Sequence, residues 1–145
     1  MRALLDINVV TARLDGGYGM HRAASVWMER QLEQGWATTA ITQNGVIRIM
    51  SQPSYPNHRS AAEVAERVAE ACNHASHLSW GEEFSLLEAG LIQWNRVLGP
   101  RQITDCSLLA FAAKWGGPFV SFDQRIRVDL VPGARPDHLE TIPVP

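Results

Sequence analysis

The stretch that decides the fold class is Ala3-Leu4-Leu5-Asp6-Ile7-Asn8-Val9-Val10. Its apolar run ends at Asp6, which is typical of a buried strand, and a helical pattern from Ile7 to Leu14 follows the acid directly. The same arrangement returns near the other end of the chain, where Pro118-Phe119-Val120-Ser121-Phe122 precedes Asp123. We therefore expect two buried strands that each end on an acid.

Between these two joins, apolar residues at helical spacing alternate with brief extended runs. Ser60-Ala61-Ala62-Glu63 has the spacing of a capping box, and Thr104 is expected to cap a helix after a loop over 99–103. Further helices are expected over residues 21–33, 39–50, 60–72, 84–97 and 104–115, and strands over 36–38, 77–80 and 139–142. This alternation predicts one domain, residues 1–145, of the α/β class with a mainly parallel sheet.

The composition is that of a globular protein, with 46% hydrophobic and 19% charged residues. No apolar run approaches the roughly 20 residues of a membrane helix, and an acid at position 6 comes too early for a signal peptide. Cys72 and Cys106 lie in helical patterns without a pairing motif, which favours a reducing, cytoplasmic location. The formal net charge is -2, and this permits RNA binding only if arginines line one groove.

Three acids are candidates for a common site. Asp6 and Asp123 follow strands, and in open α/β sheets sites lie outside the carboxyl ends of the strands. Asp105 is expected in the first turn of the helix before the second of these strands. Taken singly, the acids are explained by helix capping, the helix dipole and turn chemistry. Clustered carboxylates repel one another unless a cation compensates, and oxygen ligands favour Mg²⁺ or Mn²⁺.

Four segments, in order, resemble PIN domains, and in particular the toxins of the VapC family. The segments are residues 4–10 (LLDINVV), 39–48 (TAITQNGVIR), 102–112 (QITDCSLLAFA) and 116–123 (GGPFVSFD). Together they span nearly the whole chain, and their order makes the match specific. The resemblance implies a three-layer PIN-like fold, in which helices flank a central, mainly parallel sheet.

The same resemblance implies a Mg²⁺-dependent (or Mn²⁺-dependent) endoribonuclease, the toxin of a type II toxin–antitoxin pair. Asp6, Asp105 and Asp123 would be the catalytic, metal-binding residues, while Asn8 and Ser121 would orient them. The resemblance also implies an RNA substrate, a homodimer and a VapB-like antitoxin. Arg48 is a candidate RNA contact, and other basic residues that could flank the groove are Arg22, Arg101, Lys114, Arg125 and Arg127. The apolar faces of residues 7–14 and 39–50 are candidate antitoxin surfaces.

The sequence departs from the family at Gln43, where VapC-type toxins have a Glu. Gln43 can still ligate weakly through its carbonyl oxygen but brings no charge, so we expect weaker metal binding. This leaves open a catalytically weak PIN module that acts mainly by binding RNA or its antitoxin. Glu82, Glu83 and Glu88 are possible substitutes for the missing acid.

A receiver or phosphoryl-transfer domain is a further alternative, because it also has an Asp at a strand end. The segment Asp6-Ile7-Asn8 lacks the second acid that such domains need, and Lys114, the only lysine, precedes its strand instead of following it. These two features disfavour that alternative.

Overall fold

The computed structural model describes residues 1–144, so that only Pro145 of the expected domain lies outside the described residues. In chain order its elements are β1 (Ala3–Leu5), α1 (Ile7–Leu14), α2 (His21–Gln31), β2 (Trp36–Thr38), α3 (Ala40–Met50), α4 (Ala61–Cys72), β3 (His77–Ser79), η1 (Trp94–Arg96), α5 (Arg101–Trp115), β4 (Phe119–Ser121), η2 (Val128–Leu130), η3 (Pro136–His138) and β5 (Leu139–Thr141). Within this part of the chain, no helix is long and apolar enough to cross a membrane.

The five strands form one sheet in the order β3-β2-β1-β4-β5, and every described pairing is parallel. The α/β prediction is confirmed, and so is the edge strand near the C-terminus. The chain builds outward from β1 to β3 on one side and then returns to place β4 on the other side of β1. The carboxyl ends of β1 and β4 therefore meet at the switch point of the sheet, where α/β folds place their sites.

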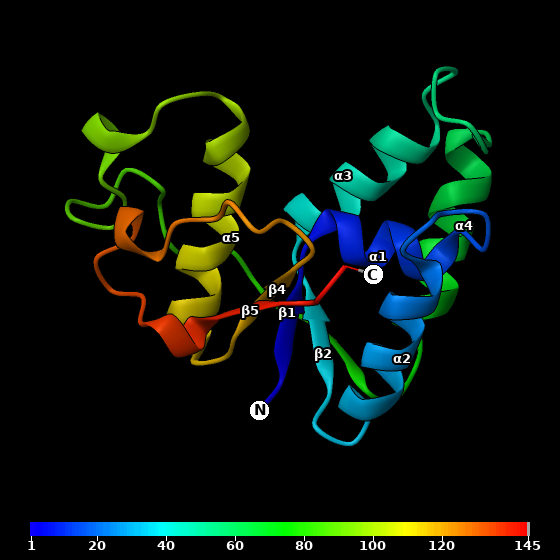
Figure 1. The fold of residues 1–145 in the computed structure, drawn as a ribbon, viewed down its shortest axis with the longest axis horizontal. Helices are drawn as coiled ribbons and strands as arrows, with labels where there is room; N and C mark the ends of the chain where they lie inside the picture. Colours follow the sequence, from blue (N-terminus) through cyan, green and yellow to red (C-terminus); the bar gives the residue numbers. More distant parts are fainter. Residues whose placement is uncertain (145) are drawn as a thin grey trace.

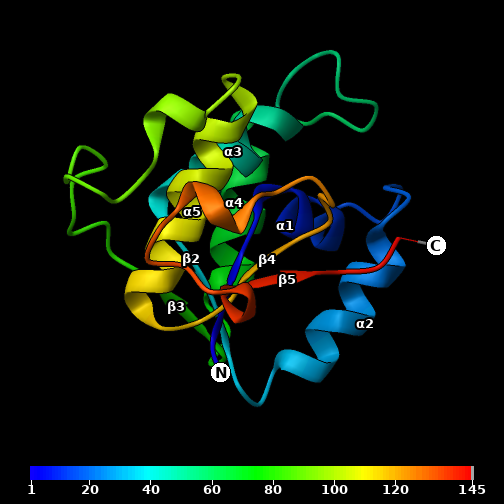
Figure 2. The ribbon, with the colours of Figure 1, turned by 60° about the vertical axis from the view of Figure 1, so that its left-hand side comes forward.

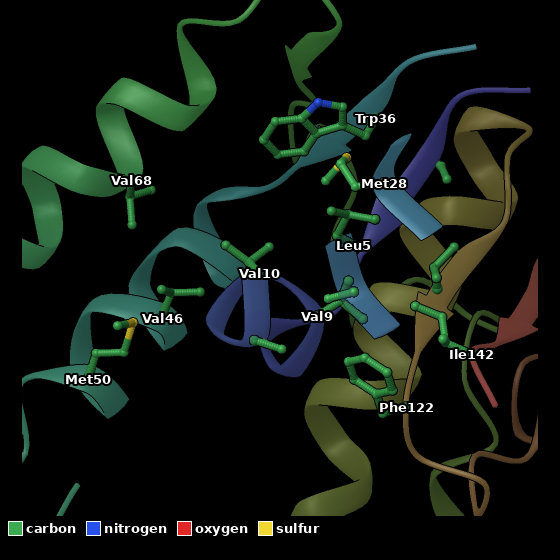
Figure 3. Packing of buried hydrophobic residues seen from close by; sticks show 14 of the residues in the cluster. Leu5, Val9, Val10, Met28, Trp36, Val46, Met50, Val68, Phe122 and Ile142 are labelled. Atoms are coloured by element: carbon green, nitrogen blue, oxygen red, sulfur yellow. The ribbon is translucent and has the colours of Figure 1, made fainter. Parts of the chain in front are cut away.

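Helices cover both faces of the sheet, which gives the expected three layers (Figure 1). Side chains alternate along each strand: Leu5 and Val120 point into the core shared with α1–α4, whereas Leu4 and Phe119 point into the core shared with α5. Figure 3 shows the first of these cores, with Leu5 of β1 among residues of α1, α2, α3 and α4. Helix α2 lies beside β5 at the edge of the sheet (Figure 2), where Trp27 donates a hydrogen bond to Glu140.

Helices α3 and α4 each begin directly after a side chain that caps them. The Thr39 side chain accepts from the backbone N–H of Thr42, and Ser60 does the same for Glu63 at 3.2 Å. Helix α3 approaches α1 closely at Gly45, because a Cβ on this residue would lie 2.2 Å from Cδ1 of Ile7. Glycine at this position lets α1 and α3 pack directly against each other above the sheet.

Two expectations for the segment before β4 are wrong. Residues 84–97 form turns and the short η1 instead of a helix. Gly90 takes φ +79°, a left-handed conformation that ends regular helix, and Leu91 and Ile92 are instead buried against the α5 side of the sheet.

The start of α5 is the second error. The helix begins at Arg101, because Pro100 already has helical angles (φ -63°, ψ -25°), and Thr104 lies inside the helix instead of capping it. Asp105 is consequently the fifth residue of α5 and does not lie in the first turn. A stabilising contact with the helix dipole explains its presence less well, since that effect fades beyond the first turn.

Candidate metal centre and active site

Asp6 is fixed between the central strand and the first helix. Its backbone N–H donates to Val120 at 2.9 Å, and its Oδ1 accepts from the N–H of Ile7 at 2.7 Å as the N-cap of α1. Oδ2 accepts from the hydroxyl of Ser121 at 2.6 Å. The residue is only 5% exposed. These three hydrogen bonds therefore fix a buried carboxylate at the carboxyl end of the central strand β1.

Ser121 and Asn8 connect the ends of β1 and β4. The Ser121 hydroxyl donates to Asp6 and accepts from the Asn8 amide at 3.1 Å and from the Asp123 N–H at 3.0 Å. The Asn8 carbonyl oxygen in turn accepts from the N–H of Phe122 at 3.3 Å. Ser121 therefore touches the acid directly, whereas Asn8 acts on it through Ser121.

Asp105 reaches the same place from α5. Burial is the main cause that raises its pKa to about 7, and the charges of Asp6 and Asp123 raise it further. The pKa of Asp6 is raised to about 6, again first by burial, with the Asp123 charge adding to it and the hydrogen bonds from Ser121 and Ile7 opposing it. Asp123 is thus close enough to disfavour the charged forms of both Asp6 and Asp105.

Asp123 differs from the other two acids because Arg125 neutralises it. The Arg125 N–H and Nε donate to Asp123 Oδ1 at 2.9 and 3.1 Å, and a second guanidinium nitrogen reaches Oδ2 at 3.4 Å. These bonds hold the pKa of Asp123 below its usual value. In this arrangement both carboxylate oxygens of Asp123 already have a partner.

These contacts decide how well the three acids suit a metal ion. Over residues 1–144, no three His, Cys, Asp or Glu side chains are arranged to hold a metal ion, and the grip of Arg125 on Asp123 is one physical reason. The donor set itself suits a hard divalent cation, because it consists of carboxylates that repel one another in a buried site. A cation would relieve that repulsion once Asp123 turned away from Arg125.

A pocket of about 170 Å³ opens beside Asp105 and Asp123. It lies between α5 and the segment that follows β4, and arginines form much of its wall. Its lining residues include Arg101, Gln102, Arg125, Arg127 and Leu130. Three of the five basic residues suggested by the sequence are therefore here, whereas Lys114 pairs with Glu88 at 2.8 Å near the far end of α5.

The side chain of Gln43 forms a hydrogen bond to Thr38 and not to the acids. Its amide nitrogen donates to the Thr38 hydroxyl at 3.0 Å, and that hydroxyl lies 2.8 Å from Nε2 of His77. His77 is buried, which lowers its pKa and favours the neutral ring. A Glu at position 43 would lack the N–H that Thr38 receives here. The sequence analysis missed Thr38 and His77, although Thr38 is a polar residue at the end of a buried strand.

The glutamates considered as substitutes for the missing acid are engaged elsewhere or exposed. Glu82 accepts from the N–H of Ile41 at 3.0 Å, at the start of α3. Glu88 is paired with Lys114, and Glu83 is exposed. Of the three, only Glu82 lies beside the helix that carries Gln43.

Known proteins resemble this chain over most of its length. Ribonuclease VapC44 of Mycobacterium tuberculosis is 44% identical over 142 residues, which are 98% of this chain and 100% of the relative. The chain belongs to the VapC family of ribonucleases. Ribonuclease VapC39 of the same organism is 36% identical over 124 residues, or 85% of this chain and 89% of the relative. The search of protein-family models found no match.

The VapC assignment agrees with the fold. The crystal structure of VapBC2 from Rickettsia felis, bound to a DNA fragment from the promoter, superimposes with a TM-score of 0.63. It covers 97% of this chain and 98% of that one at 12% identity, so the likeness concerns the fold alone. The PIN-like fold expected from the sequence is confirmed.

Arg48 stands apart from the other VapC site candidates. It lies in the last turn of α3 and is exposed. It forms no ion pair with any residue in the described part of the chain. Its role as an RNA contact remains a prediction.

Proposed function

We propose that this chain is a Mg²⁺- or Mn²⁺-dependent endoribonuclease and the toxin of a VapBC-type pair. The observation that carries this proposal is the convergence of Asp6, Asp105 and Asp123 at the switch point of the sheet. Two of these acids have a raised pKa because they are buried near like charges. Such an arrangement costs stability and is typical of functional sites.

Each residue has a distinct part in the proposed reaction. Asp6, Asp105 and Asp123 would hold the cation, which supplies the charge that activates water and offsets charge on the phosphoryl oxygens. The hydroxyl of Ser121 keeps Asp6 in one orientation by its 2.6 Å hydrogen bond. Arg125 would be free to donate to a phosphate oxygen of the RNA if Asp123 turned from it toward the cation.

The antitoxin partner is part of the same proposal, and R. felis VapBC2 supports it by its name. The apolar faces of α1 and α3 suggested by the sequence are largely used in the core, as Val9 and Val46 show. A groove of about 620 Å³ beside α1, α2 and α4 offers more free apolar surface. Leu32 at its edge is 37% exposed, and the buried hydroxyl of Ser25 has no partner within the described residues. We propose that an apolar antitoxin segment binds here and supplies an acceptor or donor for Ser25.

The remaining expectations belong to this proposal as family properties. They are a single domain over 1–145, a homodimer and a cytoplasmic location. Each agrees with a VapC-type toxin that acts on cellular RNA.

A catalytically weak module that mainly binds RNA or antitoxin is the second candidate. The contact between Gln43 and Thr38 favours it, because the position that carries a Glu in the family is here turned to a neutral hydroxyl. Such a protein would still hold RNA through the arginines of its pocket.

Cleavage of a structured RNA, first with Mg²⁺ and then with Mn²⁺, separates the two candidates. The enzyme requires cleavage that EDTA abolishes and that the Asp6→Asn variant lacks. Asp137→Asn is the matched control, since Asp137 is an exposed acid paired only with Arg135. RNA binding without cleavage in either metal would support the weak module, and cleavage that persists in EDTA would contradict the metal-dependent mechanism.

A further inference from the structure

The segment before α5 runs along one wall of the active-site pocket. The N–H of Gln93 donates to the carbonyl of Leu130 at 2.9 Å, and the N–H of Leu98 donates to the side chain of Gln102 at 2.6 Å. Leu130 and Gln102 both line the pocket that holds Asp105. Figure 1 shows this yellow-green segment and the orange segment after β4 on the α5 side of the sheet. Its surface is therefore continuous with the proposed site of cleavage.

This segment exposes large apolar side chains beside a charged site. Trp94 in η1 is 40% exposed and Leu98 is 83% exposed, and Ile103 in the first turn of α5 is 41% exposed. The preceding Leu91 and Ile92 are instead buried in the core on the α5 side of the sheet. Core packing thus accounts for Leu91 and Ile92 but not for the exposed Trp94, Leu98 and Ile103.

Arginines lie among these apolar residues and give the surface a positive balance. Arg96 and Arg127 share one carboxylate, since each has a guanidinium nitrogen 2.7 Å from Oδ2 of Asp129. Arg101 forms no ion pair with the residues that the structure describes. Three guanidinium groups therefore face a single neutralising acid outside the catalytic trio.

We propose that Trp94, Arg96, Arg101 and Arg127, here called the rim, bind the single-stranded RNA that adjoins the scissile phosphate. A base stacks on the Trp94 indole, and the arginines bind backbone phosphates. Aromatic side chains interleaved with positive charge are the usual means of holding single strands without strict sequence preference. The proposal rests on the ribonuclease function and adds to it the form of the substrate, an unpaired strand extending from the site over η1.

The charge of the rim favours RNA over a second copy of the chain. A protein interface depletes charge at its centre, whereas Trp94 has Arg96 two residues away and the Arg96–Asp129–Arg127 cluster beside it. The continuity with the pocket of Asp105 and Asp123 also brings any strand bound there to the catalytic acids. Contact between two copies is the competing outcome of the test.

The test measures binding of a fluorescein-labelled single-stranded RNA by anisotropy in EDTA, so that metal-dependent cleavage does not intervene. Stacking of one base is worth about 1–3 kcal/mol, so the Trp94→Leu variant is expected to bind roughly 5- to 150-fold more weakly. Trp94→Phe retains an aromatic face and is expected to bind more tightly than Trp94→Leu. Arg101→Gln is expected to reduce the slope of log affinity against log salt by roughly 0.7, the value for one phosphate on a single strand.

Trp115→Leu is the matched control, because Trp115 is exposed to a similar extent, 43%, but lies away from the rim. Its ring stacks on Trp80 and its N–H donates a hydrogen bond to the carbonyl of Gly81. Thermal melting of each variant checks that it is folded. Equal RNA affinity in folded Trp94→Leu and the parent protein overturns the rim proposal, as does a change confined to the oligomeric state in light scattering. If the parent protein cleaves RNA while the rim variants bind as it does, the ribonuclease function stands and only the rim proposal fails. If the parent protein neither binds nor cleaves RNA, both fail.

Discussion

Two buried acids of this chain, Asp15 and Asp6, have opposite electrostatic surroundings. Asp15 is 3% exposed and accepts hydrogen bonds from the Tyr55 hydroxyl, from the Asn57 amide at 3.0 Å and from the Gly17 N–H at 3.0 Å. Burial alone would raise its pKa, but these donors outweigh burial, and the pKa lies below the usual value. Asp6 is 5% exposed, yet burial and the Asp123 charge raise its pKa to about 6 despite two hydrogen bonds.

The difference separates a structural acid from a catalytic one. Asp15 ties the loop after α1 to the loop after α3, and its charge is satisfied within the protein. Asp6 shares its site with Asp105 and Asp123, so its charge is left to be satisfied by something that binds. A protein accepts such a loss of stability where function needs it.

Replacing Asp6 by Asn is the strongest test of this contrast. The amide can still cap α1 but removes the charge, so we expect cleavage to fall on the order of 1,000-fold, about 4 kcal/mol in the barrier. The melting temperature should not drop, because an unfavourable buried charge is removed. Single-turnover cleavage and thermal melting of the same preparation measure both effects. A variant that melts much earlier and cleaves normally when folded would reverse the assignment.

Replacing Asp15 by Asn should give the opposite result. The amide nitrogen faces donors from Tyr55, Asn57 or Gly17, and a buried donor is left without an acceptor. We expect a loss of about 2–3 kcal/mol in the free energy of unfolding. Urea denaturation measures it, while cleavage per folded molecule stays as in the parent protein. Unchanged stability would mean that the loops do not depend on this carboxylate.

The Asp105→Asn variant tests the pH dependence. In the metal-free protein the pKa of Asp105 is about 7 instead of the ordinary 3.8. Between these values the folded state binds more protons than the unfolded state, so stability falls as pH rises from about 4 to 7. Asp105→Asn removes this loss and should be more stable than the parent protein at pH 8, by roughly 1–2 kcal/mol after allowance for partial exposure. Melting curves in EDTA at pH 5 and pH 8 measure it, and parallel curves for both proteins would contradict it.

Gln43→Glu should have the smallest effect. A carboxylate near the site would strengthen Mg²⁺ binding, and we expect roughly 5- to 10-fold, about 1 kcal/mol. Part of the gain is lost because the Thr38 hydroxyl no longer receives the amide N–H. Calorimetry with Mg²⁺ measures the change, with Gln34→Glu as the control, because Gln34 is exposed and precedes the amino end of β2. Equal affinity in Gln43→Glu and the parent protein would show that position 43 does not reach the metal.

Most of the elements, and the placement of the acids at strand ends, could be predicted because both depend on short-range patterns. Asp6 follows three apolar residues, and a helix begins directly after it. The helix predicted over 84–97 failed because Leu91 and Ile92 are buried by contacts with distant parts of the chain, which local spacing does not report. The predicted start of α5 was wrong because Pro100 has no side-chain oxygen that could cap a helix, whereas Thr104 has one.

The sequence by itself determined that strands and helices alternate, that acids follow two of the strands and that Gln43 stands where the family has a Glu. Only the tertiary structure decided which acids are satisfied and which are not. The donors to Asp15 come from residues 55 and 57, and the hydroxyl on Asp6 comes from residue 121. The physical reason is that helix periodicity and capping act over a few residues, whereas desolvation and charge repulsion depend on groups brought together from distant parts of the chain.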